Sequence, residues 1–141
     1  MKVLVTGGAG YIGSICVEEL LNAGHQVWVI DNLSEGHRQA VDKRAVFIEG
    51  DLADRPFLFK TLETIRPAAV MHFAGSALVP ESMTNPGKYF RNNVANGINL
   101  LEACLQGGVE KFVFSSTCAI SANPEKSPSP KIIPKTPSAP T

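Results

Sequence analysis

Residues 2–14 read KVLVTGGAGYIGS, and this stretch decides the fold. It begins as a short run of apolar, mostly β-branched residues, passes through glycines at positions 7, 8, 10 and 13, and continues into a segment of helical period. In such a loop one glycine permits a tight turn, a second lets backbone amides approach a pyrophosphate, and a third lets helix and strand pack closely. The alternative is an ordinary strand-to-helix turn without a ligand.

The rest of the chain repeats this alternation of strand and helix. Apolar runs bounded by turn residues predict five strands: Lys2–Thr6, Gln26–Ile30, Val46–Gly50, Ala69–Phe73 and Lys111–Ser115. Between them, apolar residues at helical spacing predict one buried stripe on each of three helices. The stripes are Ile12, Ile15, Cys16, Leu20 and Ala23, then Leu58, Leu62 and Ile65 within Leu52–Ile65, then Val94, Ile98, Leu101 and Leu105. Gly24 and Gly107-Gly108 stand where helix ends need left-handed residues.

Alternation of this kind implies right-handed crossovers and a parallel sheet with helices on both faces. We therefore expect an α/β fold, a Rossmann-like doubly wound parallel sheet of about five strands buried on both faces. The 141 residues suffice for one domain, which we place at residues 1–120. Six of the ten prolines follow Ser121, so residues 121–141 are predicted to form a Pro/Lys-rich extended tail.

The composition argues against several classes of function. Thirteen basic residues balance thirteen acidic ones, so we expect neither nucleic acid nor an anionic membrane as partner. Cys16, Cys104 and Cys118 are widely spaced, which predicts reduced thiols and neither a disulfide framework nor a metal site. The first apolar run ends at the glycines after Val5, too early for a signal peptide or a membrane span. These features predict a cytoplasmic protein.

Asp31 strengthens the dinucleotide interpretation of the glycine loop. It follows the second predicted strand, eighteen residues after Gly13, where a carboxylate can accept hydrogen bonds from both ribose hydroxyls of an adenosine. A 2′-phosphate about 4 Å away would cost roughly 4 kcal/mol at an effective dielectric constant near 20, so NAD is expected over NADP. Arg38 could soften that repulsion. The alternative role is an aspartate that caps the following turn.

Two further strand ends are expected at the same crevice, because ligands bind beyond the carboxyl ends of such strands. Asp51 could accept a hydrogen bond from the adenine amino group, or it could be a helix N-cap. Ala74 and Gly75 are small enough to let a cofactor lie against backbone, or they serve packing alone. For Asn92-Asn93, a helix-capping role competes with a polar contact to the cofactor.

The order and spacing of several motifs resemble a known family. These are TGGAGYIGS, VIDNLS, GDL, HFAG, the Pro86…Tyr89…Asn92-Asn93 segment, NLLEAC and FVFSST. Up to about Cys118 they are similar to the N-terminal part of UDP-glucose 4-epimerases of the extended short-chain dehydrogenase/reductase superfamily. That family holds NAD, oxidises the sugar C4 hydroxyl with a tyrosine base, turns the 4-keto sugar over and returns the hydride to its other face.

The resemblance also implies roles for individual residues. It places the pyrophosphate at Gly7, Gly10, Tyr11, Ile12 and Gly13, the adenosine ribose at Asp31 and Asn32, the adenine at Asp51 and Leu52, the rest of the cofactor along Phe73, Ala74 and Asn93, and the nicotinamide near Ser115. Thr117 matches the catalytic Ser/Thr of the family, which hydrogen-bonds the reacting hydroxyl. Cys118-Ala119 follow it, where related dehydratases carry an Asp-Glu acid/base pair.

One part of the family's machinery is absent from the sequence. The family's tyrosine would fall near Thr141 and its lysine beyond it, while Tyr11 and Tyr89 have no lysine four residues later. We therefore predict the NAD-binding portion of a UDP-sugar 4-epimerase, an isomerase, inactive as this chain and able to bind a UDP-sugar only when the C-terminal region is supplied. A non-catalytic dinucleotide-binding module and a remnant of a related dehydratase/reductase are the alternatives. The sheet is predicted to be incomplete relative to the family, and its uncovered apolar surface favours a homodimer.

Overall fold

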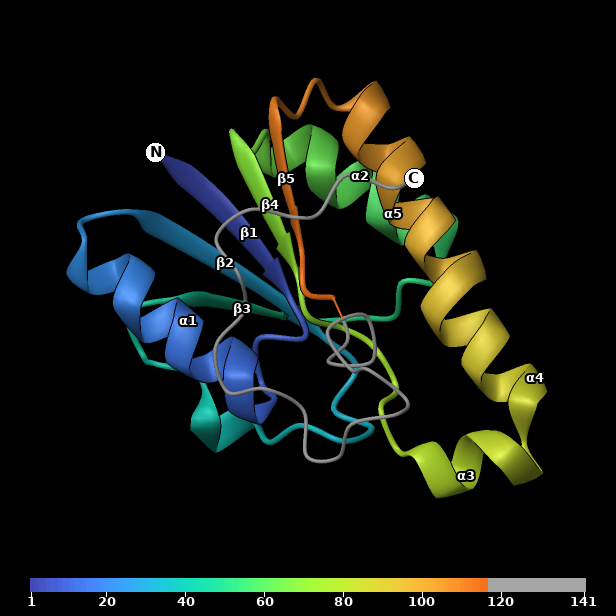
Figure 1. Cartoon of the computed structure of the whole chain (residues 1–141). Coiled ribbons are helices and arrows are strands. Elements are labelled where there is room, and N and C mark those ends of the chain that lie inside the picture. Colours follow the sequence, from blue (N-terminus) through green and yellow to red (C-terminus); the bar gives the residue numbers. More distant parts are fainter. Residues whose placement is uncertain (117–141) are drawn as a thin grey trace, which may run out of the picture.

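The structure, a computed structural model, describes residues 1–116, so Thr117 and the predicted tail lie outside the described residues (Figure 1). Five parallel strands form one sheet in the order β3-β2-β1-β4-β5. Their bounds are β1 Lys2–Thr6, β2 Gln26–Asp31, β3 Val46–Glu49, β4 Ala69–His72 and β5 Lys111–Phe114. The chain crosses from β3 back to β4, which pairs with the free side of β1. The predicted fold class is confirmed.

Helices cover the two faces of this sheet unequally. Figure 1 shows α1 (Tyr11–Asn22) on one face and α2 (Arg55–Ile65) with α5 (Asn96–Gln106) on the other. The remaining helical elements are a 3-10 turn at Arg38–Ala40, α3 (Val79–Thr84), α4 (Pro86–Tyr89) and a π-helical turn at Phe90–Ala95 that leads directly into α5. Within residues 1–116, no helix is long and apolar enough to cross a membrane.

Each face of the sheet has its own hydrophobic core, because successive strand residues point to opposite faces. Leu4, Ile30 and Val70 pack with α2 and α5, whereas Val5 and Val29 pack with α1. All five side chains are almost fully buried. Two cores on either side of one sheet account for the near-continuous apolar runs in the central strands.

The predicted burial is wrong at the edges of the sheet and on two of the helices. Val46 on β3 and Phe114 on β5 are exposed, since an edge strand has a neighbour on one side only. On α1 the buried residues are Gly13 and Val17, while Ile12 and Ile15 of the predicted stripe are exposed. The small Gly13 lies inward because close packing against the loop leaves no room for a side chain.

The stripe on α5 is also wrong. Val94, Ile98, Leu101 and Leu105 are each at least 46 % exposed, and the buried face is instead Leu100, Ala103 and Cys104. Helix α5 thus has two adjacent apolar faces. The face with small residues packs against α2 and the sheet, because it allows the closer approach. The predicted stripe Leu58, Leu62 and Ile65 on α2 is buried as expected.

Both helix ends that were predicted at glycines are confirmed. Gly24 and Gly108 have φ angles of +87° and +70°, which are left-handed and favour glycine. Helix α2 ends at Ile65, and its C-cap Arg66, immediately before Pro67, has a left-handed φ of +50°. Helix α2 also begins later than Leu52, because the carboxylate of Asp54 caps it by accepting a hydrogen bond from the Phe57 N–H (3.1 Å).

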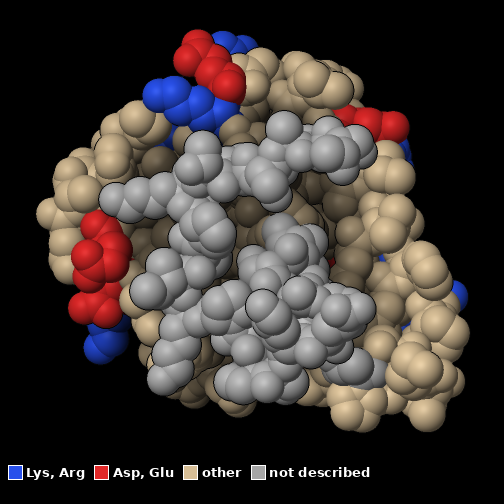
Figure 2. Space-filling view, in the orientation of Figure 1, with Lys and Arg blue, Asp and Glu red and all other residues tan. Residues whose placement is uncertain are grey.

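On the face in Figure 2, charged side chains lie in small groups near the rim, with blue and red atoms side by side in several of them.

Candidate functional site

The glycine loop between β1 and α1 is shaped by contacts that only glycine permits. Gly7 has φ +75°, and a Cβ there would lie 2.6 Å from the Ala74 nitrogen. A Cβ on Gly13 would lie 2.2 Å from the Gly7 oxygen. At Gly10, in contrast, the nearest atom to such a Cβ is the Gly7 oxygen at 3.4 Å, an ordinary contact. Gly7 therefore permits the turn and Gly13 the close packing, while Gly10 leaves space beside the loop.

Helix α1 presents unpaired backbone donors to that space. Its N-cap is Gly10, and no side chain caps the helix there. The N–H groups of the first helical turn have no partner within the helix and carry partial positive charge. They can therefore donate to an anion, such as a phosphate group.

A cavity of about 230 Å³ opens beside this loop, at the carboxyl ends of β1 to β4. Ten of the predicted cofactor residues line it: Gly7, Gly10, Tyr11, Asp31, Asn32, Asp51, Leu52, Phe73, Ala74 and Gly75. The fold thus brings together residues that are up to 68 positions apart in the sequence.

Four predicted cofactor residues do not line the cavity. Ile12 is exposed, Gly13 is packed against the loop, and the Ser115 N–H extends the β4–β5 ladder by donating to the His72 oxygen (3.1 Å). Asn93 is bonded to a neighbouring loop, as described below. Their roles toward a cofactor stay predictions, as does that of Thr117.

The cavity also has walls that the sequence analysis did not assign. They are Ile30, Ser34, Glu35, Gly36, Gly50 and Ser76, together with Asn92, whose role was left open. The loop after β2 reaches the site because it packs on the glycine loop, with a Gly36 Cβ position only 2.8 Å from the Ala9 carbonyl carbon. The His37 N–H also donates to the Ala9 oxygen (3.0 Å). The polar residues that follow Asp31 in the sequence were the one indication that this loop could contribute to the site.

Asp31 holds the loops of the site together. Its Oδ2 accepts a hydrogen bond from the Ala9 N–H and its Oδ1 accepts one from the Leu33 N–H, both at 2.9 Å. The residue is only 9 % exposed. A carboxylate has about four acceptor positions, so two remain for a ligand. Asp31 therefore caps the turn after β2, and because it also lines the cavity it can still bind a ribose; the two roles proposed from the sequence are compatible.

Two other expectations for polar residues need correction. Asp51 is not the N-cap of α2, a role that Asp54 takes, but accepts hydrogen bonds from the Ala53 N–H (2.9 Å) and from Asn32 Nδ2 (3.2 Å). Arg38 does not line the cavity; its guanidinium carbon lies 4.6 Å from the centre of the Phe47 ring.

Asn92 and Asn93 do not cap a helix, because the helical segment begins earlier, at Pro86. Both amides contact Ser76 in the loop after β4. The Asn93 Oδ1 accepts a hydrogen bond from the Ser76 N–H (2.8 Å) and its Nδ2 donates to the Ser76 oxygen (2.9 Å). Asn92 Nδ2 lies 2.7 Å from Ser76 Oγ, and Asn92 also lines the cavity.

A second, more open hollow of about 530 Å³ adjoins the cavity between the loop after β2 and the start of α5. Its lining includes Lys88 and Arg91 as well as Glu35 and Asp51. Lys88 is not a free cation, since its Nζ lies 2.7 Å from Oε1 of Glu81.

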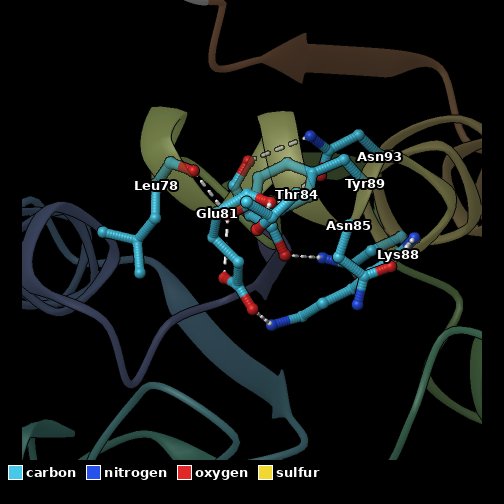
Figure 3. A network of polar contacts seen from close by, with 9 residues as sticks. Leu78, Glu81, Thr84, Asn85, Lys88, Tyr89 and Asn93 are labelled. Atoms are coloured by element: carbon cyan, nitrogen blue, oxygen red, sulfur yellow. Dashed lines mark hydrogen bonds and ion pairs between the residues drawn. The ribbon is translucent and has the colours of Figure 1, made fainter.

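Neither tyrosine of the sequence is suited to act as a base in this structure. The Tyr89 hydroxyl lies 2.8 Å from the Leu78 oxygen and 2.9 Å from Glu81 Oε2 (Figure 3). Desolvation and the hydrogen bond to Glu81 raise the pKa of Tyr89, whereas a base near neutral pH needs a lowered one. Tyr11 is 85 % exposed beside the glycine loop.

Comparison with known proteins agrees with this arrangement. UDP-glucose 4-epimerase of Lacticaseibacillus casei is 48 % identical over 140 residues, which are 99 % of this chain and 42 % of that protein. A crystal structure of UDP-glucose 4-epimerase from Brucella ovis in complex with NAD has a TM-score of 0.84 at 46 % identity, covering 90 % of this chain and 39 % of that one. The structure of the Thermotoga maritima enzyme with UDP-glucose has a TM-score of 0.81 at 39 % identity, covering 83 % and 38 %.

The chain thus spans about two fifths of the length of the relatives that it matches. Its residues 3–141 match the family model described as NAD dependent epimerase/dehydratase family. A match of this extent, together with a shared fold at more than 40 % identity, establishes the relationship. The chain belongs to the NAD-dependent epimerase/dehydratase family.

Proposed function

We propose that this chain is the NAD-binding part of a UDP-glucose 4-epimerase. The observation that carries the proposal is the cavity at the carboxyl ends of the strands, which combines an uncapped helix N-terminus with the carboxylate of Asp31. A dinucleotide needs both features, one for its pyrophosphate and one for its adenosine ribose. The open side of Gly10 leaves room for phosphate oxygens against the backbone.

Different strand ends of the cavity are proposed to bind different parts of the dinucleotide. Backbone N–H groups of Tyr11 and Ile12, beside the open side of Gly10, would hold the pyrophosphate, Asp31 and Asn32 the adenosine ribose, and Asp51 with Leu52 the adenine. The other half would extend over Phe73, Ala74 and Gly75 toward Ser115. When bound, NAD would accept the hydride from C4 of the sugar and give it back. Thr117 remains the proposed partner of the reacting hydroxyl.

Charge at the adenosine end favours NAD over NADP. Asp31, Glu35 and Asp51 all line the cavity, and Arg38 is held on Phe47. A 2′-phosphate about 4 Å from one carboxylate would cost roughly 4 kcal/mol at an effective dielectric constant near 20. Lys88, which lines the adjoining hollow, is already paired with Glu81.

The chain by itself is proposed to bind NAD without converting a UDP-sugar. Conversion needs a base for the C4 hydroxyl, and the raised pKa of Tyr89 makes this tyrosine unsuited to that role. This observation also favours the second candidate, a dinucleotide-binding module without catalysis. The two candidates differ once the family's C-terminal region is supplied in trans, because only the first should then turn over a UDP-sugar.

A second copy of this chain is proposed as a further partner. Phe90, Val94, Ile98, Leu101 and Leu105 are exposed along one side of the helical segment, at spacings of four, four, three and four residues. Most of the described surface over α4 and α5 in Figure 2 carries no charged residue. Two such stripes can bury each other around a two-fold axis.

Isothermal titration calorimetry with NAD and NADP tests the proposal directly. We expect saturable binding of NAD, weaker binding of NADP, and no turnover of UDP-galactose by the chain alone. If NAD does not bind while the chain melts cooperatively, the proposed function is contradicted. Turnover by the chain alone would contradict the proposed lack of activity and leave NAD binding intact.

A further inference from the structure

The loop between β4 and α3, residues 73–78, has no regular secondary structure. Its residues 73–76 line the cavity, and the whole loop is called the wall below. Such a segment needs outside partners for its backbone groups. Asn93 supplies them for Ser76, because its one side-chain amide bonds both the N–H (2.8 Å) and the carbonyl oxygen (2.9 Å) of that residue. Asn92 adds a bond to Ser76 Oγ (2.7 Å).

A second attachment holds the far end of this wall. The Tyr89 hydroxyl lies 2.8 Å from the Leu78 oxygen, and Glu81 Oε2 lies 2.9 Å from the same hydroxyl (Figure 3). The other oxygen of Glu81 pairs with Lys88 Nζ at 2.7 Å. Glu81 lies on α3 while Lys88 and Tyr89 lie on α4, so the network joins both helices to the wall.

The π-helical turn at Phe90–Ala95 explains how adjacent residues reach one target. In an α-helix, with 3.6 residues per turn, neighbours diverge by about 100° around the axis. A π turn closes its hydrogen bonds over five residues and is wider, so neighbours diverge less. Asn92 and Asn93 can therefore both point at Ser76. Such turns are rare and often occur at functional sites.

The position of the wall decides which part of a dinucleotide it can affect. Asp31 lies at the end of β2 and the helix N-terminus follows β1, so the adenosine and the pyrophosphate occupy that side of the sheet. The wall follows β4, on the opposite side of β1. Only the second ribose and its base would extend over it.

We propose that Asn93 and Tyr89 are positioning residues that hold residues 73–78 in place for the nicotinamide-side half of the dinucleotide. The inference rests on the proposed NAD binding. Neither residue needs to touch the ligand. Asn93 fixes the wall beside Gly75, and Tyr89 fixes its end at Leu78.

Comparing ADP with NAD separates this role from a general effect on folding. ADP carries the adenosine and both phosphates but lacks the second ribose and nicotinamide. By calorimetry, Asn93→Ala should weaken NAD binding about tenfold, because two hydrogen bonds to the wall are lost, and should change ADP binding less than about twofold. Tyr89→Phe keeps the ring and loses one hydroxyl, so about a threefold loss for NAD alone is expected.

The control is Gln106→Ala, which removes an exposed amide at the far end of α5 and should alter neither affinity. Equal losses for ADP and NAD, or unchanged NAD binding in a folded Asn93→Ala chain, would overturn the inference. If Asn93→Ala does not fold, Tyr89→Phe decides by the same comparison. The variant outcomes above overturn the inference alone, whereas a folded wild-type chain that does not bind NAD contradicts the proposed function and the inference with it, whether or not ADP binds.

Discussion

The two sides of the sheet differ in how their ligand-facing loops are held. On the β1–β2 side, backbone contacts fix the loop, since Gly13 packs against the backbone of Gly7 and Gly36 against that of Ala9. On the β4–β5 side, side-chain amides and a tyrosine hydroxyl hold the wall after β4. Backbone packing tolerates almost no substitution, whereas hydrogen bonds from side chains can be removed one at a time. The first side should therefore be rigid and the second adjustable.

The strongest way to break the β1–β2 side is Gly13→Ala. The added Cβ would lie 2.2 Å from the Gly7 oxygen, so either α1 or the loop must move. We expect the free energy of unfolding to fall by about 3 kcal/mol, the upper range for overpacking, and NAD binding to be lost. Urea unfolding followed by circular dichroism measures the first effect.

Gly10→Ala is the matched control for that substitution. Its Cβ would make only an ordinary 3.4 Å contact, and φ is −80°, which alanine adopts freely. Stability should therefore be unchanged or slightly raised, while the methyl group weakens NAD binding by occupying the space for phosphate. Equal destabilisation by the two substitutions would show that close packing at Gly13 does not hold the loop.

Asp31→Ala should have the next largest effect, because it removes acceptors from two backbone N–H groups. Loss of these partners is expected to cost about 2 kcal/mol of unfolding free energy. NAD binding should weaken, and the preference over NADP should narrow since a negative charge is lost. Calorimetry with both cofactors and urea unfolding measure the two effects.

Asp42→Ala provides a comparison for Asp31→Ala, since its carboxylate pairs with Arg44 at the surface. It should leave the cofactor preference unchanged. If Asp31→Ala destabilises the chain but keeps the wild-type preference for NAD, Asp31 orders the loop without facing the ribose.

Much of this fold follows from local patterns in the sequence. Each strand was predicted to within one residue of its bounds, because a buried parallel strand is a short continuous apolar run with turn residues at both ends. Gly24 and Gly108 gave two helix ends, since their positive φ is a backbone requirement. Those parts depend on residues close together in the chain.

The errors fall where distant contacts decide. The buried face of α5 carries Ala103 and Cys104 instead of the larger exposed side chains, because the approach of α2 and the sheet selects small residues. The π-helical turn has no local signal in the sequence, so the bonds from Asn92 and Asn93 to Ser76 could not be predicted. The cavity residues between Ser34 and Gly36 were missed because they reach the site by packing on the glycine loop.

Substitution of Leu101 tests whether the exposed apolar stripe along the π-helical turn and α5 forms a dimer interface. If a second copy covers the exposed stripe, Leu101→Glu would place charges in an apolar interface and convert dimer to monomer in analytical ultracentrifugation. Gln106→Glu adds the same charge off the stripe and should leave the dimer intact. A monomeric wild-type chain would contradict the homodimer and leave the ligand site untouched.

The smallest expected effect concerns pH and the end of β4. His72 is buried between β1 and β5, with its Nδ1 2.6 Å from Thr6 Oγ1 and its ring near those of Phe112 and Phe114. Desolvation lowers the pKa of His72 below its usual value of 6.5, so the folded chain binds fewer protons there than the unfolded chain. Stability from this group is complete above pH 6.5 and falls as the pH drops through that value toward the folded pKa.

The urea midpoint should therefore decrease between pH 7.5 and pH 5.5, and His72→Gln should remove part of that slope while it lowers the midpoint at pH 7.5. A carboxamide can keep a hydrogen bond to Thr6 but cannot take up a proton. An unchanged slope in His72→Gln would mean that the buried imidazole is not the group that titrates. The Phe73 N–H, where the wall begins, donates a hydrogen bond to the Thr6 oxygen (2.8 Å). If NAD binding changes with pH in parallel with the urea midpoint, the end of β4 and the wall after it respond together.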